Sequence, residues 1–361
     1  MTPRLKKLTD KLSDLDADAM LVTDEINVGY LSGFTGDSSY LFVQPNNVTI
    51  ISDGRYKTQI ASECPDLTAV IRYSGDKMID SVKSVINDSG AKRVAIESSH
   101  MSLSEFRNTA KVIDSVQWVE TNGVVESLRI IKNAEEIQII RDSVRINEQT
   151  FQSVVAKLRP DWSEREIAHE FEATMRFLGA DGVSFVPIIA AGAAGALPHY
   201  RPSAATIGDA STLLIDWGAF YRGYASDMTR TLHRPNASDR FKSAYQAVLD
   251  SQLAAIDAIK PGVLASDVDA AARGVLKSAG LADAFVHGLG HGIGLQIHES
   301  PRMSSVSQEI LEPGMVITVE PGVYFGGDFG IRIEDDVLVT DNGHEVLSTL
   351  AKGLDDCRLM L

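Results

Sequence analysis

The fold is decided by residues 314–339, GMVITVEPGVYFGGDFGIRIEDDVLV. The apolar run MVITV, the turn-forming GGD and the alternating run RIEDDVLV together predict an antiparallel hairpin. Glu320 and Glu334 are equally distant from Gly327, at the centre of that turn. A hairpin without a β-bulge would therefore place these two acids opposite each other on one face.

A second stretch, residues 211–232, repeats this arrangement in the sequence STLLIDWGAFYRGYASDMTRTL. A hairpin that turns over residues 220–223 would set Asp216 and Asp227 directly opposite each other. Like charges opposite each other destabilise a sheet, and a buried carboxylate needs a partner. The two acid pairs therefore predict a shared cation site. The alternative is that the acids lie on solvated strand faces, which fits poorly with the apolar runs TLLI and MVITV.

The segment between the two hairpins, HGLGHGIGLQIH at residues 287–298, holds three of the eight histidines in the chain. Its alternating glycines allow the backbone to pack closely against a site, and its histidines are candidates for a remaining ligand. A phosphate-binding loop is the competing interpretation, but the spacing fits neither G-x-G-x-x-G nor the Walker pattern.

The two hairpins belong to an apparent internal duplication of about a hundred residues. Each half begins with two amphipathic helices, separated by a proline and ended by a glycine. Ser163 with Glu166, and Ser266 with Asp269, are predicted to cap the second helix of each half. Corresponding positions lie 101 to 103 residues apart, namely Pro160 and Pro261, Ser163 and Ser266, and Gly179 and Gly280. The alternative is that helix–turn–helix patterns recur by chance.

The chain has 361 residues, of which 44% are hydrophobic, so we expect a globular protein of two domains. Its net charge of −15 argues against binding to nucleic acid or to anionic membranes. Two cysteines are typical of a protein from a reducing compartment, and the first 21 residues lack the apolar run of a signal peptide. We therefore expect a cytoplasmic protein.

Residues 1–126 are predicted to form a smaller α/β domain without a catalytic cluster, and residues 127–361 a duplicated α+β catalytic domain. A hairpin is expected where SYLFV and VTIIS flank residues 45–47, and a linker around residues 121–123.

The order and spacing of five residues resemble the metal ligands of the pita-bread metallopeptidases. The resemblance extends to the phrases HGIGLQIHE, VEPGVY and RIEDDVLV, and the large amino-terminal domain points to the aminopeptidase P and prolidase branch. Creatinase shares the two-domain layout but lacks the ligands. The metal ligands that the resemblance implies are Asp216, Asp227, His291, Glu320 and Glu334.

The resemblance implies two divalent ions per subunit, which hold a bridging hydroxide that attacks the bond before proline. An oxygen-rich donor set suits Mn²⁺, with Co²⁺ or Zn²⁺ as alternatives. Glu320, His298 and His199 match the family's catalytic residues. The residues expected to bind substrate are His287, Arg302, Tyr324 and Arg332.

The expected substrate is a proline-containing peptide, and the expected assembly is a homodimer, as in relatives. Arg302 resembles the arginine with which prolidases hold the carboxylate of a dipeptide, which favours an Xaa-Pro dipeptidase over an Xaa-Pro aminopeptidase acting on longer peptides. A third possibility is a non-catalytic binding protein on the same fold, although such relatives have usually lost ligands. The amino-terminal domain is expected to restrict access to the site or to mediate dimerisation.

Overall fold

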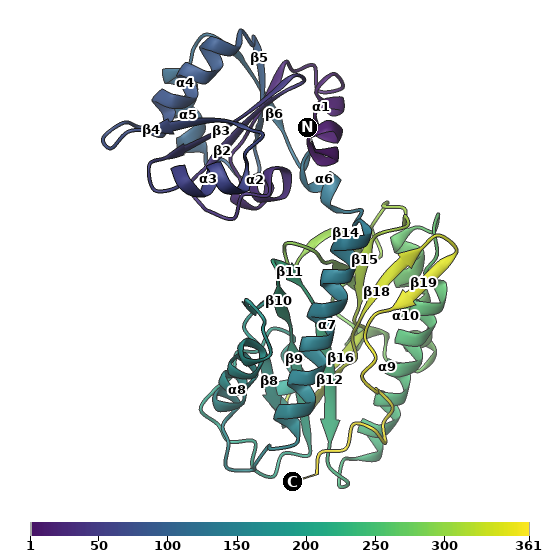
Figure 1. Ribbon diagram of the computed structural model, residues 1–361. Helices are drawn as coiled ribbons and strands as arrows, with labels where there is room; N and C mark the ends of the chain where they lie inside the picture. Colours follow the sequence, from purple (N-terminus) through teal and green to yellow (C-terminus); the bar gives the residue numbers. More distant parts are fainter. Residues whose placement is uncertain (1, 361) are drawn as a thin grey trace. The chain divides into compact units, whose positions relative to one another are not determined.

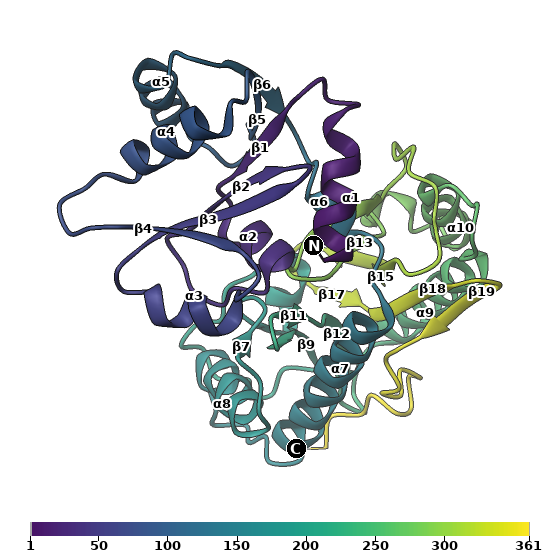
Figure 2. The same cartoon turned by 45° about the horizontal axis from the view of Figure 1, so that its top comes forward.

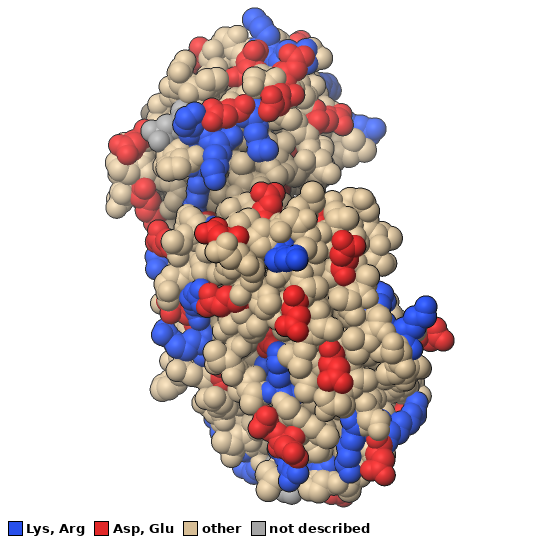
Figure 3. Space-filling view, turned by 90° about the vertical axis from the view of Figure 1, so that its right-hand side faces the viewer, with Lys and Arg blue, Asp and Glu red and all other residues tan. Residues whose placement is uncertain are grey.

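The chain divides into two compact units, Met1–Arg129 and Ile130–Leu361, and the computed structural model describes residues 2–360. Both units mix helices and strands, as predicted (Figure 1). Among residues 2–360, no helix is long and apolar enough to span a membrane. Acidic and basic side chains are interspersed on the face that Figure 3 shows, although the net charge of the chain is −15.

The amino-terminal unit is built on one six-stranded sheet with the order β4-β3-β2-β1-β5-β6. The pairs β3–β4, β1–β5 and β5–β6 are parallel, whereas β1–β2 and β2–β3 are antiparallel. The strands are β1 (Ala19–Val22), β2 (Tyr40–Gln44), β3 (Asn47–Asp53), β4 (Thr68–Arg72), β5 (Arg93–Glu97) and β6 (Gln117–Thr121).

The predicted hairpin of this unit is confirmed, because β2 and β3 pair from Gln44 and Asn47 across a two-residue turn. Leu21, Phe42 and Val82 share one apolar cluster, which α4 and α5 cover on one face of the sheet (Figure 2). The helices are α1 (Pro3–Leu12), α2 (Glu25–Ser32), α3 (Lys57–Glu63), α4 (Met78–Ser89), α5 (Leu103–Val112) and α6 (Glu126–Arg129).

The carboxy-terminal unit repeats one order of elements, in which two helices are followed by a group of strands. Helices α9 and α10 lie side by side in both views (Figures 1 and 2). The helices of the unit are α7 (Ala134–Val155), α8 (Glu164–Phe177), α9 (Asp239–Ala258) and α10 (Ala265–Ser278), with short 3₁₀ turns η1 (Gly192–Ala196) and η2 (Ala282–Ala284).

The strands of this unit form four small sheets with the orders β11-β10-β7, β12-β9-β8, β14-β13-β15-β18-β19 and β16-β17. Those of the first half are β7 (Gly182–Val183), β8 (Ile188–Ala191), β9 (Thr212–Trp217), β10 (Ala219–Tyr221), β11 (Tyr224–Ala225) and β12 (Met228–His233). Those of the second half are β13 (Gly290–Gly292), β14 (Glu299–Met303), β15 (Val316–Val319), β16 (Gly322–Phe325), β17 (Phe329–Arg332), β18 (Asp335–Thr340) and β19 (Gly343–Val346).

One large apolar core joins the helices of both halves to the strands between them. Trp217 on β9 stacks on Phe151 of α7 at a centroid distance of 4.6 Å, and Phe171 of α8 packs on the same indole. Phe241 on α9 packs edge-on against Phe329 of β17. Large aromatic side chains therefore anchor β9, which carries Asp216, and β17, which precedes Glu334, to the helices.

The glutamate hairpin has the predicted register. Gly322 pairs with Arg332 on one side of the acids and Val319 with Asp335 on the other, so that pairing is symmetric about Gly327. This register places Glu320 and Glu334 opposite each other.

The aspartate hairpin turns one residue later than predicted, because Tyr221 pairs with Tyr224 and the turn is Arg222-Gly223. Both turn residues have positive φ, 48° and 78°, as a type I′ turn requires. Asp216 consequently faces Thr229 rather than Asp227. Because Asp227 precedes Thr229 by two residues, the two aspartates still belong to one face.

The two predicted helix caps have different outcomes. Ser163 and Glu166 form the expected capping box at the start of α8. Helix α10 instead begins after Leu264, which has no capping side chain, so the Ser266–Asp269 prediction is wrong. Asp269 is fully buried, and its carboxylate accepts hydrogen bonds from Arg273 and from the backbone N–H of Leu289.

Candidate active site

Five side chains from both halves of the carboxy-terminal unit converge at the ends of its central strands. Three of them, Asp227, His291 and Glu334, offer ligand atoms that all lie within 4.8 Å of one another. His291 Nε2 is 3.7 Å from Asp227 Oδ2 and 3.5 Å from Glu320 Oε1. Asp216 joins the group through β9, where it faces Thr229, whose hydroxyl donates to Glu334 Oε2 at 2.6 Å. The structure thus brings together the five residues expected to bind metal.

Arg332 connects the acids to the expected substrate-binding residues. Its Nη2 donates to Asp216 Oδ2, its Nε to Thr229 Oγ1 at 3.1 Å, and its Nη1 to Tyr324 Oη at 2.7 Å. The Tyr324 hydroxyl is in turn 2.9 Å from His287 Nε2. One buried guanidinium therefore fixes an aspartate and a tyrosine on either side of it.

His287 itself is held from behind by helix α10. Arg273 donates to the carbonyl oxygens of His287 and Phe285, and its guanidinium lies 4.2 Å from the centroid of the Phe285 ring. Because Asp269 binds Arg273 and the backbone of Leu289, the segment that carries His287 is fixed at three points.

His298, His199 and Arg302 form the exposed side of the site. The His298 ring is edge-on to His291 at a centroid distance of 4.4 Å. Burial lowers the pKa of His298, and the charges of His199 and Arg302 lower it further. Within residues 2–360 the Arg302 guanidinium makes no hydrogen bond or ion pair, since only its backbone N–H is engaged, by Glu309.

Two glycines allow the strands to approach the site closely, as their alternation indicates. A Cβ atom on Gly290 would lie 2.2 Å from the carbonyl oxygen of Thr318, and one on Gly292 would lie 2.2 Å from that of Ser300. Any side chain at these positions would push β13 away from β15 or β14, and would move His291 with it.

The carboxyl groups of the site are buried among themselves, which favours their protonated forms. Burial raises the pKa of Asp227 well above its usual range, and the charges of Glu334 and Asp216 raise it further. Burial, together with the charges of Glu320 and Asp216, also raises the pKa of Glu334 well above its usual range. Burial raises the pKa of Glu320 to about 8 despite the opposing charge of Arg332. Protein groups alone leave this cluster short of positive charge.

The imidazoles of His291 and His287 are held neutral, the form that binds metal or accepts a proton. Burial lowers the pKa of His291 to about 4, helped by the charge of His298. Burial also lowers the pKa of His287 to about 4, helped by the charge of Arg332. Burial raises the pKa of Tyr324 to about 12, so its hydroxyl keeps its proton as a donor.

These residues fit divalent metal ions. Asp216 Oδ1 and Asp227 Oδ1 are buried, and neither has a hydrogen-bond partner among residues 2–360. Buried carboxylate oxygens without partners are costly unless a cation neutralises them. Four carboxylates and one neutral imidazole are a donor set for hard or borderline dications, and such ions would reverse the pKa shifts of the acids.

Two residues of the site have no role predicted from the sequence. Thr229 donates to Glu334 and accepts from Arg332, and Asp336 accepts the backbone N–H of Asp227 at 3.0 Å. The alternation of a strand contains the signal for both, because each lies two residues after an expected ligand.

Comparisons with known proteins agree with this geometry. A model of metallopeptidase family M24 matches residues 138–341, and one of the creatinase/prolidase N-terminal domain matches residues 4–131. The chain is 32% identical to an Xaa-Pro dipeptidase of Pyrococcus furiosus over 98% of this chain and 100% of that one.

Two solved structures are similar over nearly their whole length. An Xaa-Pro dipeptidase from Bacillus anthracis has 35% identity and a TM-score of 0.94, covering 97% of this chain and 98% of that one. An X-Pro aminopeptidase from Thermotoga maritima has 35% identity and a TM-score of 0.88, covering 95% and 99%. The chain belongs to metallopeptidase family M24, with a creatinase/prolidase domain at its amino-terminal end.

Proposed function

We propose that this metallopeptidase is an Xaa-Pro dipeptidase whose ions are held by Asp216, Asp227, His291, Glu320 and Glu334. The observation that supports this most strongly is the convergence of these five side chains, with buried carboxylate oxygens that have no hydrogen-bond partner among residues 2–360. Two bound divalent ions would supply Lewis-acid activation of water and polarisation of the scissile carbonyl. The oxygen-rich donor set supports Mn²⁺ as the physiological ion.

The residues of the chain supply proton transfer and orientation. Glu320, which lies beside His291 on the open side of the cluster, would take the proton of the attacking water and pass it to the leaving nitrogen. His298 and His199 would donate hydrogen bonds to the oxygen that gains charge in the transition state. Arg332 and Thr229 would keep Asp216 and Glu334 in place.

A bond before proline suits such a site. The nitrogen of that bond has no N–H, so a site that relied on this donor could not hold the substrate. A site that binds the carbonyl oxygen and the free amino group of a dipeptide does not need the missing hydrogen.

Arg302 supports a dipeptide as the preferred substrate. Its guanidinium is exposed, has no protein partner among residues 2–360, and influences the pKa of both His291 and His298. An unpaired guanidinium can bind the carboxylate of a dipeptide through two hydrogen bonds. A longer peptide has an amide at that position and would leave the arginine without an anion.

The second candidate is an Xaa-Pro aminopeptidase. The similarity to the Thermotoga maritima aminopeptidase, at the same 35% identity as the Bacillus anthracis dipeptidase, is the observation that favours it.

Initial rates on Xaa-Pro dipeptides and Xaa-Pro-Yaa tripeptides, measured with added Mn²⁺, separate the two candidates. A dipeptidase cleaves Xaa-Pro with the higher kcat/KM. Faster cleavage of tripeptides would assign the chain to the aminopeptidases, and cleavage of neither would refute the peptidase proposal.

A further inference from the structure

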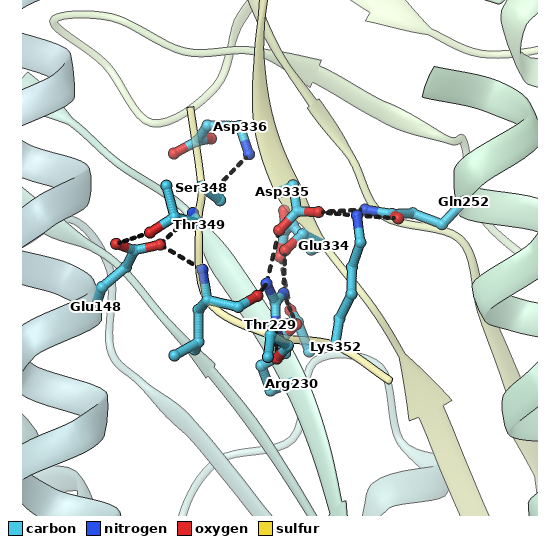
Figure 4. A network of polar contacts seen from close by, with 12 residues as sticks. Glu148, Thr229, Arg230, Gln252, Glu334, Asp335, Asp336, Ser348, Thr349 and Lys352 are labelled. Carbon is cyan, nitrogen blue, oxygen red and sulfur yellow. Dashed lines mark hydrogen bonds and ion pairs between the residues drawn. The ribbon is translucent and has the colours of Figure 1, made fainter. Parts of the chain in front are cut away.

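Three successive acids, Glu334, Asp335 and Asp336, alternate between the two faces of the chain where β18 begins. Glu334 receives a hydrogen bond from Thr229, and Asp336 receives one from the backbone N–H of Asp227. Asp335 points to the opposite side, into a network of charged groups in which the expected ligand Glu334 takes part through its backbone carbonyl oxygen (Figure 4). Because Glu334 and Asp335 are joined by a peptide bond, contacts that fix the backbone at Asp335 also fix the position of Glu334.

Arg230 is the centre of this network. It is fully buried, and all five of its N–H groups are used. Nη1 donates to the carbonyl oxygens of Thr229 at 2.9 Å and of Glu334 at 2.6 Å. Nη2 donates to Asp335 Oδ1 and to the carbonyl oxygen of Leu350, both at 2.7 Å, while Nε donates to that of Ala351 at 3.3 Å. One guanidinium thus joins β12, the start of β18 and the carboxy-terminal end of the chain.

The other carboxylate oxygen of Asp335 is held from the same end of the chain. Lys352 Nζ donates to Asp335 Oδ2 and to Gln252 Oε1, and Gln252 Nε2 also donates to Asp335 Oδ2 at 2.8 Å. Tyr245 on α9 donates its hydroxyl to the Lys352 carbonyl oxygen at 2.9 Å. Asp335 is therefore neutralised by two cations from distant parts of the sequence.

Residues 348–352 have no regular secondary structure, yet side chains from several elements hold them (Figure 4). Glu148 on α7 accepts from the backbone N–H groups of Thr349 and Leu350 and from the Thr349 hydroxyl. The Ser348 hydroxyl accepts from the backbone N–H of Asp336 at 3.0 Å. The segment is thus bound to helix α7 on one side and to the acids of β18 on the other.

We propose that residues 348–352 act as a carboxy-terminal clamp that positions the Glu334 and Asp227 ligands through Arg230, Asp335 and Asp336. This inference rests on the proposed metal site. The clamp residues touch neither substrate nor ions, so their role is positioning. Groups that orient ligands from outside the site change metal affinity by about 10–100-fold when they are replaced, because ligands must be held to within about half an ångström.

Two variants test the clamp without removing its buried centre. Glu148→Gln puts an amide where three donors need an acceptor, at a half-buried position that tolerates the change. Lys352→Met keeps the length of the side chain and removes its charge. Matched controls are Glu135→Gln, an exposed residue of the same helix, and Arg358→Met, an exposed arginine beyond the clamp. The measurements are Mn²⁺ titration followed by electron paramagnetic resonance, the visible spectrum of the Co²⁺-loaded protein, and thermal unfolding of the metal-free protein.

The clamp predicts that both variants bind Mn²⁺ about 10–100-fold more weakly than the parent chain and change the Co²⁺ spectrum, while the controls do neither. Lower melting temperatures with an unchanged Mn²⁺ Kd would show a purely structural role and overturn the proposal. Unchanged melting and an unchanged Kd would overturn it too. The titration does not depend on peptide hydrolysis, so a parent chain that binds Mn²⁺ but cleaves no Xaa-Pro peptide would refute the proposed function and leave the clamp decided by the Kd values.

Discussion

Glu334 and Asp335 are neighbours in the sequence and are equally buried, with 1% of each residue exposed, yet their pKa values shift in opposite directions. Burial raises the pKa of Glu334, and the charges of Glu320 and Asp216 raise it further. Burial would also raise the pKa of Asp335, but the charges of Arg230 and Lys352 outweigh it and leave that pKa below its usual range. Asp335 is paired with two cations of the protein, whereas Glu334 forms no ion pair within residues 2–360 and the more distant charge of Arg332 does not offset its burial.

The difference separates a structural ion network from a site for an external cation. A buried carboxylate with two protein cations is complete, and removing one member of such a network destabilises the fold because it leaves a buried charge uncompensated. The cluster of buried carboxylates, in which Asp216 Oδ1 and Asp227 Oδ1 find no hydrogen-bond partner within the described part of the chain, is incomplete until a ligand of positive charge arrives. Burial alone cannot distinguish the two, and the partners of each oxygen can.

The contrast between the incomplete cluster and the ion network would fail most clearly if an acid of the cluster could be replaced without loss of activity. We expect Asp227→Ala to lower kcat/KM for Xaa-Pro by at least about 10⁴-fold, because a lost metal ligand removes several kcal/mol of transition-state stabilisation. Far-UV circular dichroism should stay unchanged, since the substitution removes a repelled charge and little core volume. A near-normal rate with Mn²⁺ present would show that the cluster is not the metal site.

A substitution in the complete network around Asp335 should change the stability of the fold instead. We expect Asp335→Asn to lower the free energy of unfolding of the metal-free protein by about 3–5 kcal/mol, because Arg230 would remain buried without its counter-charge. Asp336→Asn is the matched control, since Asp336 is equally buried and has no cation partner among residues 2–360. Urea titrations that found Asp336→Asn the more damaging change would contradict this account.

Arg302 and Arg332 extend the comparison to the substrate. Arg332 is buried and paired with Asp216, whereas the Arg302 guanidinium is exposed and unpaired within residues 2–360. If Arg302 holds the carboxylate of a dipeptide, Arg302→Ala should weaken binding of Xaa-Pro by about 1.5–3 kcal/mol, visible as a higher KM. The KM for Xaa-Pro-Yaa tripeptides should change little. Equal losses for both substrates would remove the carboxylate role.

The smallest expected effect concerns pH. In the metal-free protein the pKa of Glu320 is raised to about 8, so the folded state holds this proton more tightly than the unfolded state does. Its contribution to stability is therefore fully present below about pH 4.3, the unperturbed pKa of a glutamate, and is lost as pH rises towards 8. We expect the melting temperature of the metal-free protein to fall over this range and saturating Mn²⁺ to reverse the fall. The contribution of Asp335 to stability depends on pH in the opposite direction. Its pKa is lowered in the folded state, so the ionised carboxylate favours the folded state at neutral pH.

Proton release on metal binding, measured by calorimetry, is a second test of the raised pKa values in the cluster. Binding of Mn²⁺ at pH 7 should release protons, because the ligands must lose them before they can coordinate. Titrations in two buffers of different ionisation enthalpy would detect this release, and equal apparent heats would exclude it.

The two hairpins show how much of the site could be predicted from the sequence. The symmetric turn about Gly327 places Glu320 opposite Glu334 as counting predicts. The turn of the aspartate hairpin is displaced by one residue because Arg222 adopts a positive φ, a conformation that is uncommon for arginine and that the sequence therefore does not predict. The shared face survives the shift, because a turn displaced by one residue changes each pairing by two positions.

The supporting network could not be predicted in the same way. Arg230 and Lys352 lie more than a hundred residues apart and belong to no local pattern, and only the folded chain brings both to Asp335. The predicted cap at Ser266 fails because Asp269 is engaged elsewhere, by Arg273 one turn later on the same helix and by the backbone N–H of the distant Leu289. The hairpin symmetry and the family resemblance thus indicated the candidate ligands but not the residues that hold them.

The most direct test of the central claim is to restore activity to chelator-treated protein by titration with Mn²⁺. Hydrolysis of an Xaa-Pro dipeptide would be measured against equivalents of metal added per chain. The incomplete cluster predicts no hydrolysis without metal and full activity once two equivalents are bound. Hydrolysis that survives complete removal of metal, or none at any Mn²⁺ concentration, would contradict it.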